Sequence, residues 1–282
     1  MEFFKVATAA LFCLFLVYFY SNNPTHQNWF DYKAEIMRKR ILHKTKICSQ
    51  LELNQDLEPS KFIYNEELGL IGCVINKVGS TSLTTAFLQL LELKTYSRGS
   101  VWNSSHLIRP ENSTHLKHLL KKSKLRFIFV RHPIDRLISS YYDKFVTNEA
   151  LSLIEYRKKV KRIANFVNKT NFSTSDQVTF QEFLQVEVLK RKATPNNFGR
   201  HWAPFYQLCS PCEIKYDFIG KLDSSLEDIL YFWRLTGLDL RVPIPWRHQN
   251  SHDNSVLLES VDDFVLEKVY EKYKLDFDLF DF

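Results

Sequence analysis

Residues 76–81, with the sequence NKVGST, combine the groups that bind phosphate and related anions. Lys77 supplies a cation, and the hydroxyls of Ser80 and Thr81 supply hydrogen-bond donors. Gly79 has no side chain to keep the backbone away from a ligand. A helix that begins directly after such a loop directs its first N–H groups, which have no partner within the helix, toward an anion. The segment is therefore a candidate phosphate-binding loop.

The order of residues in this loop differs from the Walker A motif of nucleotide kinases. In Walker A, Gly-Lys-Ser/Thr opens the helix and an earlier glycine precedes it. In this chain Lys77 comes before Gly79, and the earlier glycine is absent. This order argues against a P-loop kinase, and taken alone the segment is also compatible with an ordinary turn that carries a lysine.

A second candidate anion site follows residues 125–130. Arg131 comes directly after this apolar run, and the planar guanidinium of arginine can hold phosphate through two hydrogen bonds. Ser139 lies further along, in a helical pattern, and can offer its hydroxyl to the same anion. Arg136 shares that helical pattern and is interpreted as a charge on the helix surface. Together with the loop at Lys77, Arg131 favours an anion-binding site over an ordinary turn.

Two strand-to-helix units are expected to position these residues. Residues 68–75 (LGLIGCVI) form an apolar run that is typical of a strand buried on both faces, and residues 82–93 have helical spacing. Residues 125–130 and 134–145 repeat this arrangement. Because ligands of α/β sheets bind at the carboxyl ends of the strands, both candidate anion sites are expected at one edge. The pattern predicts an α/β fold with a parallel sheet flanked by helices.

The rest of the chain adds helices and one more strand. A strand is predicted over residues 218–222, and helices over 151–167, 180–191 and 261–274. Ser224 and Glu227 form a capping box for a further helix, which ends at Gly237. An aromatic tail, residues 277–282, follows the last helix.

The amino terminus indicates the compartment. Residues 6–20 (VATAALFCLFLVYFY) carry no charge and approach the length of about 20 residues that spans a bilayer. Bulky residues at the end of this run argue against signal-peptide cleavage, and a buried core helix is a further alternative. We expect an uncleaved signal anchor with Lys5 in the cytoplasm. The chain would then comprise a cytoplasmic tail (1–5), a transmembrane anchor (6–20), a luminal stem with a short helix (21–60) and a luminal globular domain (61–282).

Sequons and cysteines are consistent with a lumen. Four Asn-x-Ser/Thr sequons, the signal for N-glycosylation, occur at Asn103, Asn112, Asn168 and Asn171. Beyond the anchor lie four cysteines, Cys48, Cys73, Cys209 and Cys212, which an oxidising compartment could join in any of three complete pairings. Cys209 and Cys212 also have the spacing of half a zinc site, but no second such pair exists, so no metal is expected.

The formal net charge of +6 fits an acidic partner, such as nucleotide phosphates or an anionic glycan, and also a merely soluble basic surface. The densest basic cluster is Arg157, Lys158, Lys159, Lys161 and Arg162, which is interpreted either as a solvated helix face or as a glycan contact. The sequence contains no nucleic-acid-binding motif, and no nucleic-acid partner is expected.

Several segments together resemble the carbohydrate sulfotransferases, in the branch that holds the chondroitin, dermatan, GalNAc 4-O- and HNK-1-type enzymes. Residues 76–81 are similar to the 5′-phosphosulfate loop of that family, and residues 129–145 (FVRHPIDRLISSYYDKF) to its 3′-phosphate segment. The similarity continues in order through residues 201–204 (HWAP), 208–212 (LCSPC), 216–222 (YDFIGKL) and 273–280 (YKLDFDLF). It departs from the family at Asn76, where a proline is usual, and at residues 82–85 (SLTT), where Asn-Trp and basic residues are usual.

The resemblance implies the sulfotransferase fold and a donor, 3′-phosphoadenylyl sulfate (PAPS), that carries both anionic groups. The 5′ end would be bound by Lys77 and the backbone N–H groups of Val78, Gly79, Ser80 and Thr81, and the 3′-phosphate by Arg131 and Ser139. Lys77 would also neutralise the departing phosphate oxygen during in-line transfer, which needs mainly positioning and charge stabilisation.

Transfer to a sugar hydroxyl also needs a general base. His201 is the expected base, because it stands in a matched motif beside Trp202, which could stack on a sugar ring. His132, His248 and His252 are the alternatives, with a structural or purine-side role expected for His132.

The expected function is sulfuryl transfer from PAPS to a glycan hydroxyl, the 4-hydroxyl of GalNAc in chondroitin- or dermatan-type chains, by a single-pass type II Golgi membrane enzyme. The alternatives are a uronyl 2-O-sulfotransferase of the same superfamily and a catalytically silent glycan-binding membrane protein. The sequence leaves the oligomeric state open.

Overall fold

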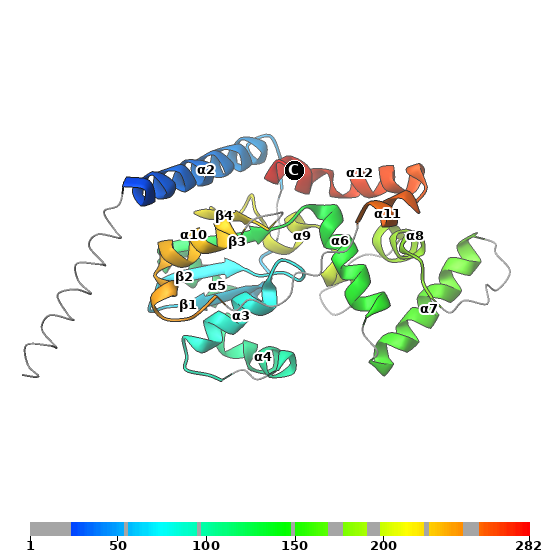
Figure 1. Cartoon of the computed structure of the whole chain (residues 1–282), viewed down its shortest axis with the longest axis horizontal. Coiled ribbons are helices and arrows are strands. Elements are labelled where there is room, and N and C mark those ends of the chain that lie inside the picture. Colours follow the sequence, from blue (N-terminus) through cyan, green and yellow to red (C-terminus); the bar gives the residue numbers. More distant parts are fainter. Residues whose placement is uncertain are drawn as a thin grey trace, which may run out of the picture.

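A four-stranded mixed sheet lies at the centre of the chain (Figure 1). In spatial order its strands are β1 (Phe62–Asn65), β2 (Leu70–Cys73), β3 (Leu125–Val130) and β4 (Phe218–Lys221). Strands β2, β3 and β4 run parallel, as the sequence predicts, whereas β1 pairs antiparallel with β2 at the edge and was not predicted. The structure, a computed structural model, describes residues 24–53, 56–94, 97–147, 150–168, 177–190, 198–222, 226–244 and 254–282.

Helices surround the sheet. They are α2 (Pro24–Cys48), α3 (Ser80–Gln89), α4 (Arg98–Ser104), α5 (Ser113–Lys122), α6 (Pro133–Tyr141), α7 (Leu151–Asn168), α8 (Phe180–Phe183), α9 (Phe205–Cys209), α10 (Glu227–Thr236), α11 (Asn254–Glu259) and α12 (Asp263–Phe280). Short 3₁₀ turns are η1 (Pro59–Lys61), η2 (Ser105–Ile108), η5 (Phe198–His201) and η6 (Leu238–Leu240), and π-helical turns are η3 (Tyr142–Val146) and η4 (Leu184–Lys190). In Figure 1, α3 and α4 lie on the β1 side, α2 runs beside β4, and α6, α7 and α8 lie together on the right.

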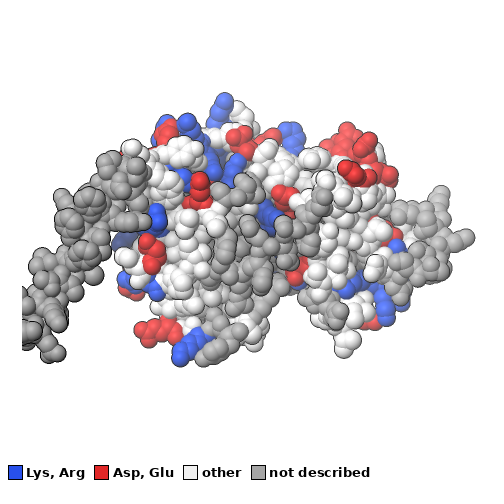
Figure 2. Space-filling view, in the orientation of Figure 1, with Lys and Arg blue, Asp and Glu red and all other residues white. Residues whose placement is uncertain are grey.

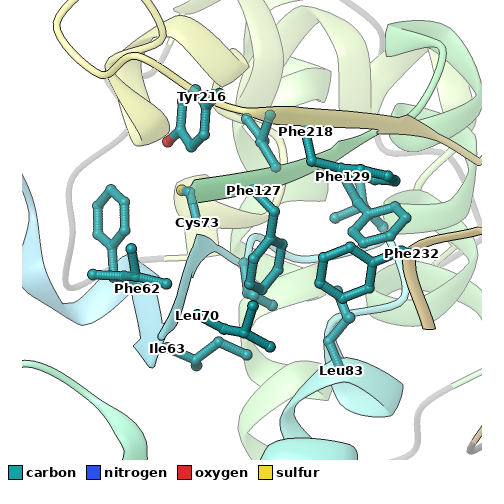
Figure 3. Close-up of a cluster of buried hydrophobic side chains, with 14 of the residues drawn as sticks. Phe62, Ile63, Leu70, Cys73, Leu83, Phe127, Phe129, Tyr216, Phe218 and Phe232 are labelled. Carbon is teal, nitrogen blue, oxygen red and sulfur yellow. The ribbon is translucent and has the colours of Figure 1, made fainter. Parts of the chain in front are cut away.

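Phenylalanines from β3, β4 and α10 fill the main core (Figure 3). Two glycines make room for them: Gly72 stands opposite Phe127 in the β2–β3 register, and Gly220 stands opposite Phe129 in the β3–β4 register. A Cβ atom at Gly72 would lie 2.3 Å from the Phe127 ring, and one at Gly220 would lie 2.4 Å from the Phe129 ring. Any side chain at either glycine would therefore displace a core ring.

A second apolar core lies beyond the sheet and joins α6, η3, α7, α8, η4 and α12. Trp202 belongs to it: the side chain is 2% exposed, contacts the Phe183 ring edge-on, and donates from Nε1 to the Glu187 carbonyl at 3.2 Å. The expectation that Trp202 stacks on a sugar ring is therefore wrong, because no ligand can reach its face.

Helix α2 is packed against the globular domain. It lies against β4, α10 and α12, although the sequence predicts a stem in this region. The carboxylate of Asp228, 2% exposed, accepts hydrogen bonds from Lys33 Nζ at 2.6 Å, from Arg40 and from the backbone N–H of Lys221 at 2.9 Å. These contacts tie α2 to the end of β4 and to α10.

Two disulfides bind the segment around α9 to distant elements. Cys48, the last residue of α2, pairs with Cys212, and Cys73, the last residue of β2, pairs with Cys209. The second bond fixes the strand end from which the candidate phosphate loop starts.

The predicted signal anchor, residues 6–20, lies outside the described residues. Within the described ranges, no helix is both long and apolar enough to cross a bilayer.

Among the sequons, Asn103 on α4 and Asn112, the N-cap of α5, are exposed. Asn112 Oδ1 accepts from the His115 N–H at 2.9 Å, which leaves its Nδ2 as the atom that would carry a glycan. Asn168 ends α7, and Asn171 lies outside the described residues.

Candidate active site

The loop between β2 and α3 has an unusual backbone. Both Lys77, with φ of 72°, and Gly79, with φ of 73°, adopt the left-handed conformation. For a residue with a side chain this conformation costs about 1–3 kcal/mol, and such strain concentrates at functional sites. The side chain of Val78 between them is fully buried and anchors the loop in the main core. The fold thus holds Lys77 in a strained position at the end of β2.

Helix α3 begins directly after this loop. Gly79 is its N-cap, and the first bond within the helix runs from Leu83 N to the Gly79 carbonyl at 3.0 Å. The N–H groups of Ser80, Thr81 and Ser82 precede that bond, so they are the helix-terminal donors that attract anions. A Cβ atom at Gly79 would meet Leu222 Cδ1 at 3.5 Å, an ordinary van der Waals distance, so the backbone there is not crowded. The loop therefore fits the 5′ end of the expected donor.

Arg131 lies just before the neighbouring helix α6, and Ser139 lies within it. Arg131 follows the last residue of β3, and because β2 and β3 are parallel neighbours it emerges at the same sheet edge as the loop at Lys77. Both Arg131 and Ser139 are half-buried, with Ser139 in the last turn of α6. The residues of the two predicted anion sites thus lie at one edge of the sheet.

Arg136 has a different role from the predicted one. Its side chain is 1% exposed and is not a surface charge. Nε donates to the Asn76 carbonyl at 3.2 Å, Nη1 donates to the Ala203 carbonyl at 2.7 Å, and the guanidinium lies 4.7 Å from the Phe205 ring centre. Arg136 therefore joins the loop at Lys77 to the segment that carries His201.

Four ionisable side chains gather where α6 ends. Lys77 Nζ lies 3.5 Å from Asp143 Oδ2, and Lys144 Nζ lies 3.2 Å from the same oxygen. His201, 8% exposed, is electrostatically coupled to all three, and its carbonyl accepts the Ser140 hydroxyl at 3.0 Å. The structure thus brings together the two predicted catalytic residues, Lys77 and His201. Asp143 and Lys144 were missed, although both lie within the YYDKF end of the quoted 3′-phosphate motif.

His201 is neutral in this environment. Burial, and then the cations of Lys144 and Arg200, lower the pKa of His201 from 6.5 to about 2. Without further negative charge in the site, its imidazole is available to accept a proton but is weakly basic. An anionic donor beside Lys77 would offset part of the positive potential and raise this pKa.

This shift predicts acid sensitivity. Because the pKa of His201 is lower in the folded than in the unfolded chain, the unfolded state binds more protons, so stability is lost as the pH falls below 6.5. Between pH 7 and pH 5 the free energy of unfolding should fall by about 2 kcal/mol more in the wild type than in His201→Asn. Urea titrations at both pH values measure the difference, and an equal fall in both proteins would contradict the assigned environment.

The carboxyl-terminal helix holds the segment before α9. Tyr273 OH donates to the Trp202 carbonyl, and the buried carboxylate of Asp276 accepts from the N–H groups of Phe205 at 2.6 Å and Tyr206 at 2.9 Å. The resemblance around residues 273–280 therefore coincides with side chains that position the site from behind.

The other candidate histidines fall in two groups. The ring of His132 packs edge-on against Phe277 and Phe282, with ring centres 5.3 and 5.7 Å apart, in keeping with the expected structural role. His248 and His252 lie outside the described residues. In the described part of the chain, no group of three or more His, Cys, Asp or Glu side chains is arranged to hold a metal ion.

Comparison with known proteins identifies the family. A profile described as "Sulfotransferase family" matches residues 60–282. Carbohydrate sulfotransferase 11 of Rattus norvegicus is 28% identical over 93% of this chain and 82% of its own length, and carbohydrate sulfotransferase 12 of Mus musculus is 28% identical over 93% and 72%. Carbohydrate sulfotransferase 14 of Danio rerio is 33% identical over 61% of this chain and 46% of its own length. No solved structure gives a significant match. The chain therefore belongs to the sulfotransferase family, among the carbohydrate sulfotransferases, and is an enzyme that uses PAPS as its sulfuryl donor.

Proposed function

We propose that this enzyme transfers a sulfuryl group from PAPS to the 4-hydroxyl of GalNAc in chondroitin- or dermatan-type chains. The observation that carries the proposal is the strained Lys77 loop at the start of α3, next to Arg131 at the same sheet edge. This arrangement supports the assignment of two anion sites, one for each end of a donor that carries a 5′-phosphosulfate and a 3′-phosphate. The names of the relatives support a carbohydrate as the acceptor.

The residues have distinct proposed roles. The acceptor hydroxyl attacks sulfur in line, its bond to sulfur forms as the sulfur–oxygen bond to the nucleotide phosphate breaks, and the hydroxyl proton passes to a base. Lys77 and the N–H groups of Val78 to Thr81 stabilise the charge that develops on the departing phosphate. Arg131 and Ser139 hold the 3′-phosphate.

His201 is proposed as the base. It is neutral, as a base must be, and it belongs to the same cluster as Lys77. The bound donor would raise its basicity at the time when a proton must be accepted.

We further place the enzyme in the Golgi membrane as a type II protein, anchored through residues 6–20, with N-glycans at Asn103, Asn112, Asn168 and Asn171. Two disulfides support an oxidising compartment, and the exposure of Asn103 and Asn112 supports their modification.

The direct test incubates the full chain with labelled PAPS and a panel of desulfated chondroitin, dermatan and heparan chains. Label on the GalNAc 4-hydroxyl supports the proposal, and label on a uronic acid supports the 2-O-sulfotransferase alternative. Tight PAPS binding without transfer to any member of the panel would contradict the proposed acceptor.

Helix α7 offers a surface for an anionic acceptor. Arg157 Nε donates to the Lys144 carbonyl at 2.8 Å, so α7 adjoins the cluster around Asp143. The next basic residues, Lys158, Lys159 and Arg162, are exposed, and Figure 2 shows Lys and Arg side chains gathered over this helix. Lys161 is instead buried and pairs with Glu182 at 2.8 Å. The predicted basic cluster is thus divided among a solvated face, one internal ion pair and the half-buried Arg157, which binds a backbone carbonyl.

Replacing Lys158, Lys159 and Arg162 together by alanine should lower kcat/KM for an anionic glycan by about tenfold at low salt, since the three charges attract the chain. The KM for PAPS should not change. Lys117→Ala with Lys121→Ala on α5, two exposed lysines, serves as a control. A fall that persists at high salt, or that also affects a neutral acceptor, would contradict an electrostatic role for α7.

A further inference from the structure

The side chain of Lys77 lies next to the carboxylate of Asp143. The side chains of Lys77, Asp143 and Lys144 are only 17%, 11% and 11% exposed. Ion pairs at this depth are screened by water and salt much less than surface pairs. The attraction between Lys77 and Asp143 is therefore strong enough to influence what else Lys77 can bind.

The position of Asp143 follows from a local departure in the helix. Helix α6 continues directly into the π-helical turn η3, and Asp143 is the second residue of that turn. Turns of this type are rare and occur frequently at functional sites, because they redirect the side chains that follow. η3 is held from outside by Arg157, whose Nε donates to the Lys144 carbonyl at 2.8 Å. Asp143 is thus held against Lys77 by a fixed backbone.

An anion entering the loop at residues 76–81 meets two opposed effects. It is attracted by Lys77 and by the first N–H groups of α3, but it must replace Asp143 as the counter-ion of Lys77 and approach a negative charge. Lys144, 3.2 Å from the same carboxylate oxygen, can keep Asp143 neutralised after Lys77 turns to the ligand. Because two lysines share one carboxylate, the ligand can replace Asp143 as the counter-ion of Lys77 at a small electrostatic cost.

We propose that Asp143 is a positioning residue that acts as a built-in counter-ion: it holds Lys77 at the loop in the absence of donor and yields Lys77 to the donor. The inference rests on the proposed role of Lys77 in binding the phosphosulfate. In this arrangement Asp143 weakens the binding of donor and of product nucleotide alike. It then reclaims Lys77 after transfer, which promotes release of the product, adenosine 3′,5′-bisphosphate.

The test measures binding of adenosine 3′,5′-bisphosphate to the full chain by calorimetry, in the wild type and in Asp143→Asn, which keeps the shape and removes the charge. Removing one negative charge near the ligand should tighten binding by about tenfold, and dissociation measured by stopped flow should slow by a similar factor. A residue with a merely structural role would not tighten binding when it is changed. Asp143→Ala should also bind the nucleotide more tightly than the wild type. This second variant excludes the possibility that the tightening comes from new hydrogen bonds of the asparagine amide.

The matched control is Glu66→Gln, which removes one carboxylate from an exposed ion pair with Lys122. Glu66 lies in the turn between β1 and β2, at the opposite end of β2 from the loop at residues 76–81. This substitution should leave nucleotide affinity within twofold of the wild type. The tightening caused by Asp143→Asn should also be smaller in a Lys77→Ala background, because the part of it that comes from releasing Lys77 is then lost.

The outcomes separate this inference from the proposed function. If Lys77→Ala does not weaken nucleotide binding, Lys77 has no role in nucleotide binding and the counter-ion inference fails, whereas the proposed function is judged separately by transfer of label to the glycan. If Lys77→Ala weakens binding but Asp143→Asn leaves it unchanged or weakens it, only the counter-ion role is overturned. A fall in kcat for Asp143→Asn without tighter nucleotide binding would also overturn it, and would point to Asp143 as a proton acceptor.

Discussion

Lys77→Ala is expected to lower kcat by about 10³-fold, the loss typical for removal of one group that stabilises developing charge in a transition state. The proposed role of Lys77 is to neutralise the phosphate oxygen that leaves sulfur, so its contribution is larger in the transition state than in the bound donor. The KM for PAPS should rise less than kcat falls. Initial rates with labelled PAPS at saturating acceptor measure both quantities.

The backbone at Lys77 makes alanine a clean substitution. Because its φ is 72°, glycine would relax the strain and loosen the loop, whereas alanine retains the backbone strain and removes the charge together with the side chain beyond Cβ. Lys77→Arg, which keeps a cation, should recover part of the activity. A loss of less than tenfold in Lys77→Ala, with an unchanged melting temperature, would show that the charge is stabilised by another group.

Arg131→Ala should weaken PAPS binding by about 10²–10³-fold, because a charged partner of a phosphate is lost from a half-buried site. The affinity for adenosine 5′-phosphosulfate, which lacks the 3′-phosphate, should remain within a few-fold of the wild-type value. The variant should therefore lose most of the preference for PAPS over this analogue. Calorimetric titration of both nucleotides into both proteins measures the change.

The two-ligand design separates recognition from folding. If Arg131 serves only to support the fold, Arg131→Ala should weaken both nucleotides equally, and the preference for PAPS would survive. Ser139→Ala should show the same selective pattern with a smaller effect, because a neutral hydroxyl contributes less than a guanidinium to binding phosphate.

The sequence predicted the centre of the fold well because its signals are local. The buried strands β2 and β3 are short uninterrupted apolar runs, and each is followed at once by residues suited to binding an anion. The end of α10 at Gly237 was also predicted, since its left-handed φ of 69° suits glycine. Strand β1 was missed, because Phe62–Asn65 gains its sheet identity only by pairing with β2.

Features that depend on distant contacts were not predictable. Most of the predicted aromatic tail, residues 277–282, is in fact the end of α12, because Leu279 and Phe280 pack into the main core. Arg136 reads as a surface charge in a helical pattern, but two backbone carbonyls from separate segments bind it inside the protein. In each case the deciding neighbour lies far away in the sequence.

The candidate site was half predictable for a related reason. Lys77 and Arg131 follow strand ends, and topology alone places such residues at one sheet edge. The position of Asp143 beside Lys77 depends on the π-helical turn η3, and the sequence contains no clear signal for that turn. Trp202 belongs to one of the motifs that resemble the family, but its burial depends on packing against α8, η4 and α12, which are distant in the sequence or separate elements.

The disulfides also constrain the order in which the chain can mature during synthesis. Cys48 and Cys73 leave the ribosome early, and their partners follow 164 and 136 residues later. Neither native bond can close until almost the whole sheet has been synthesised, while the two early cysteines are already able to pair wrongly with each other. Any early bond between Cys48 and Cys73 must be undone by thiol–disulfide exchange once Cys209 and Cys212 have emerged, so the yield of this enzyme in a host cell should rise with the isomerase capacity of that cell.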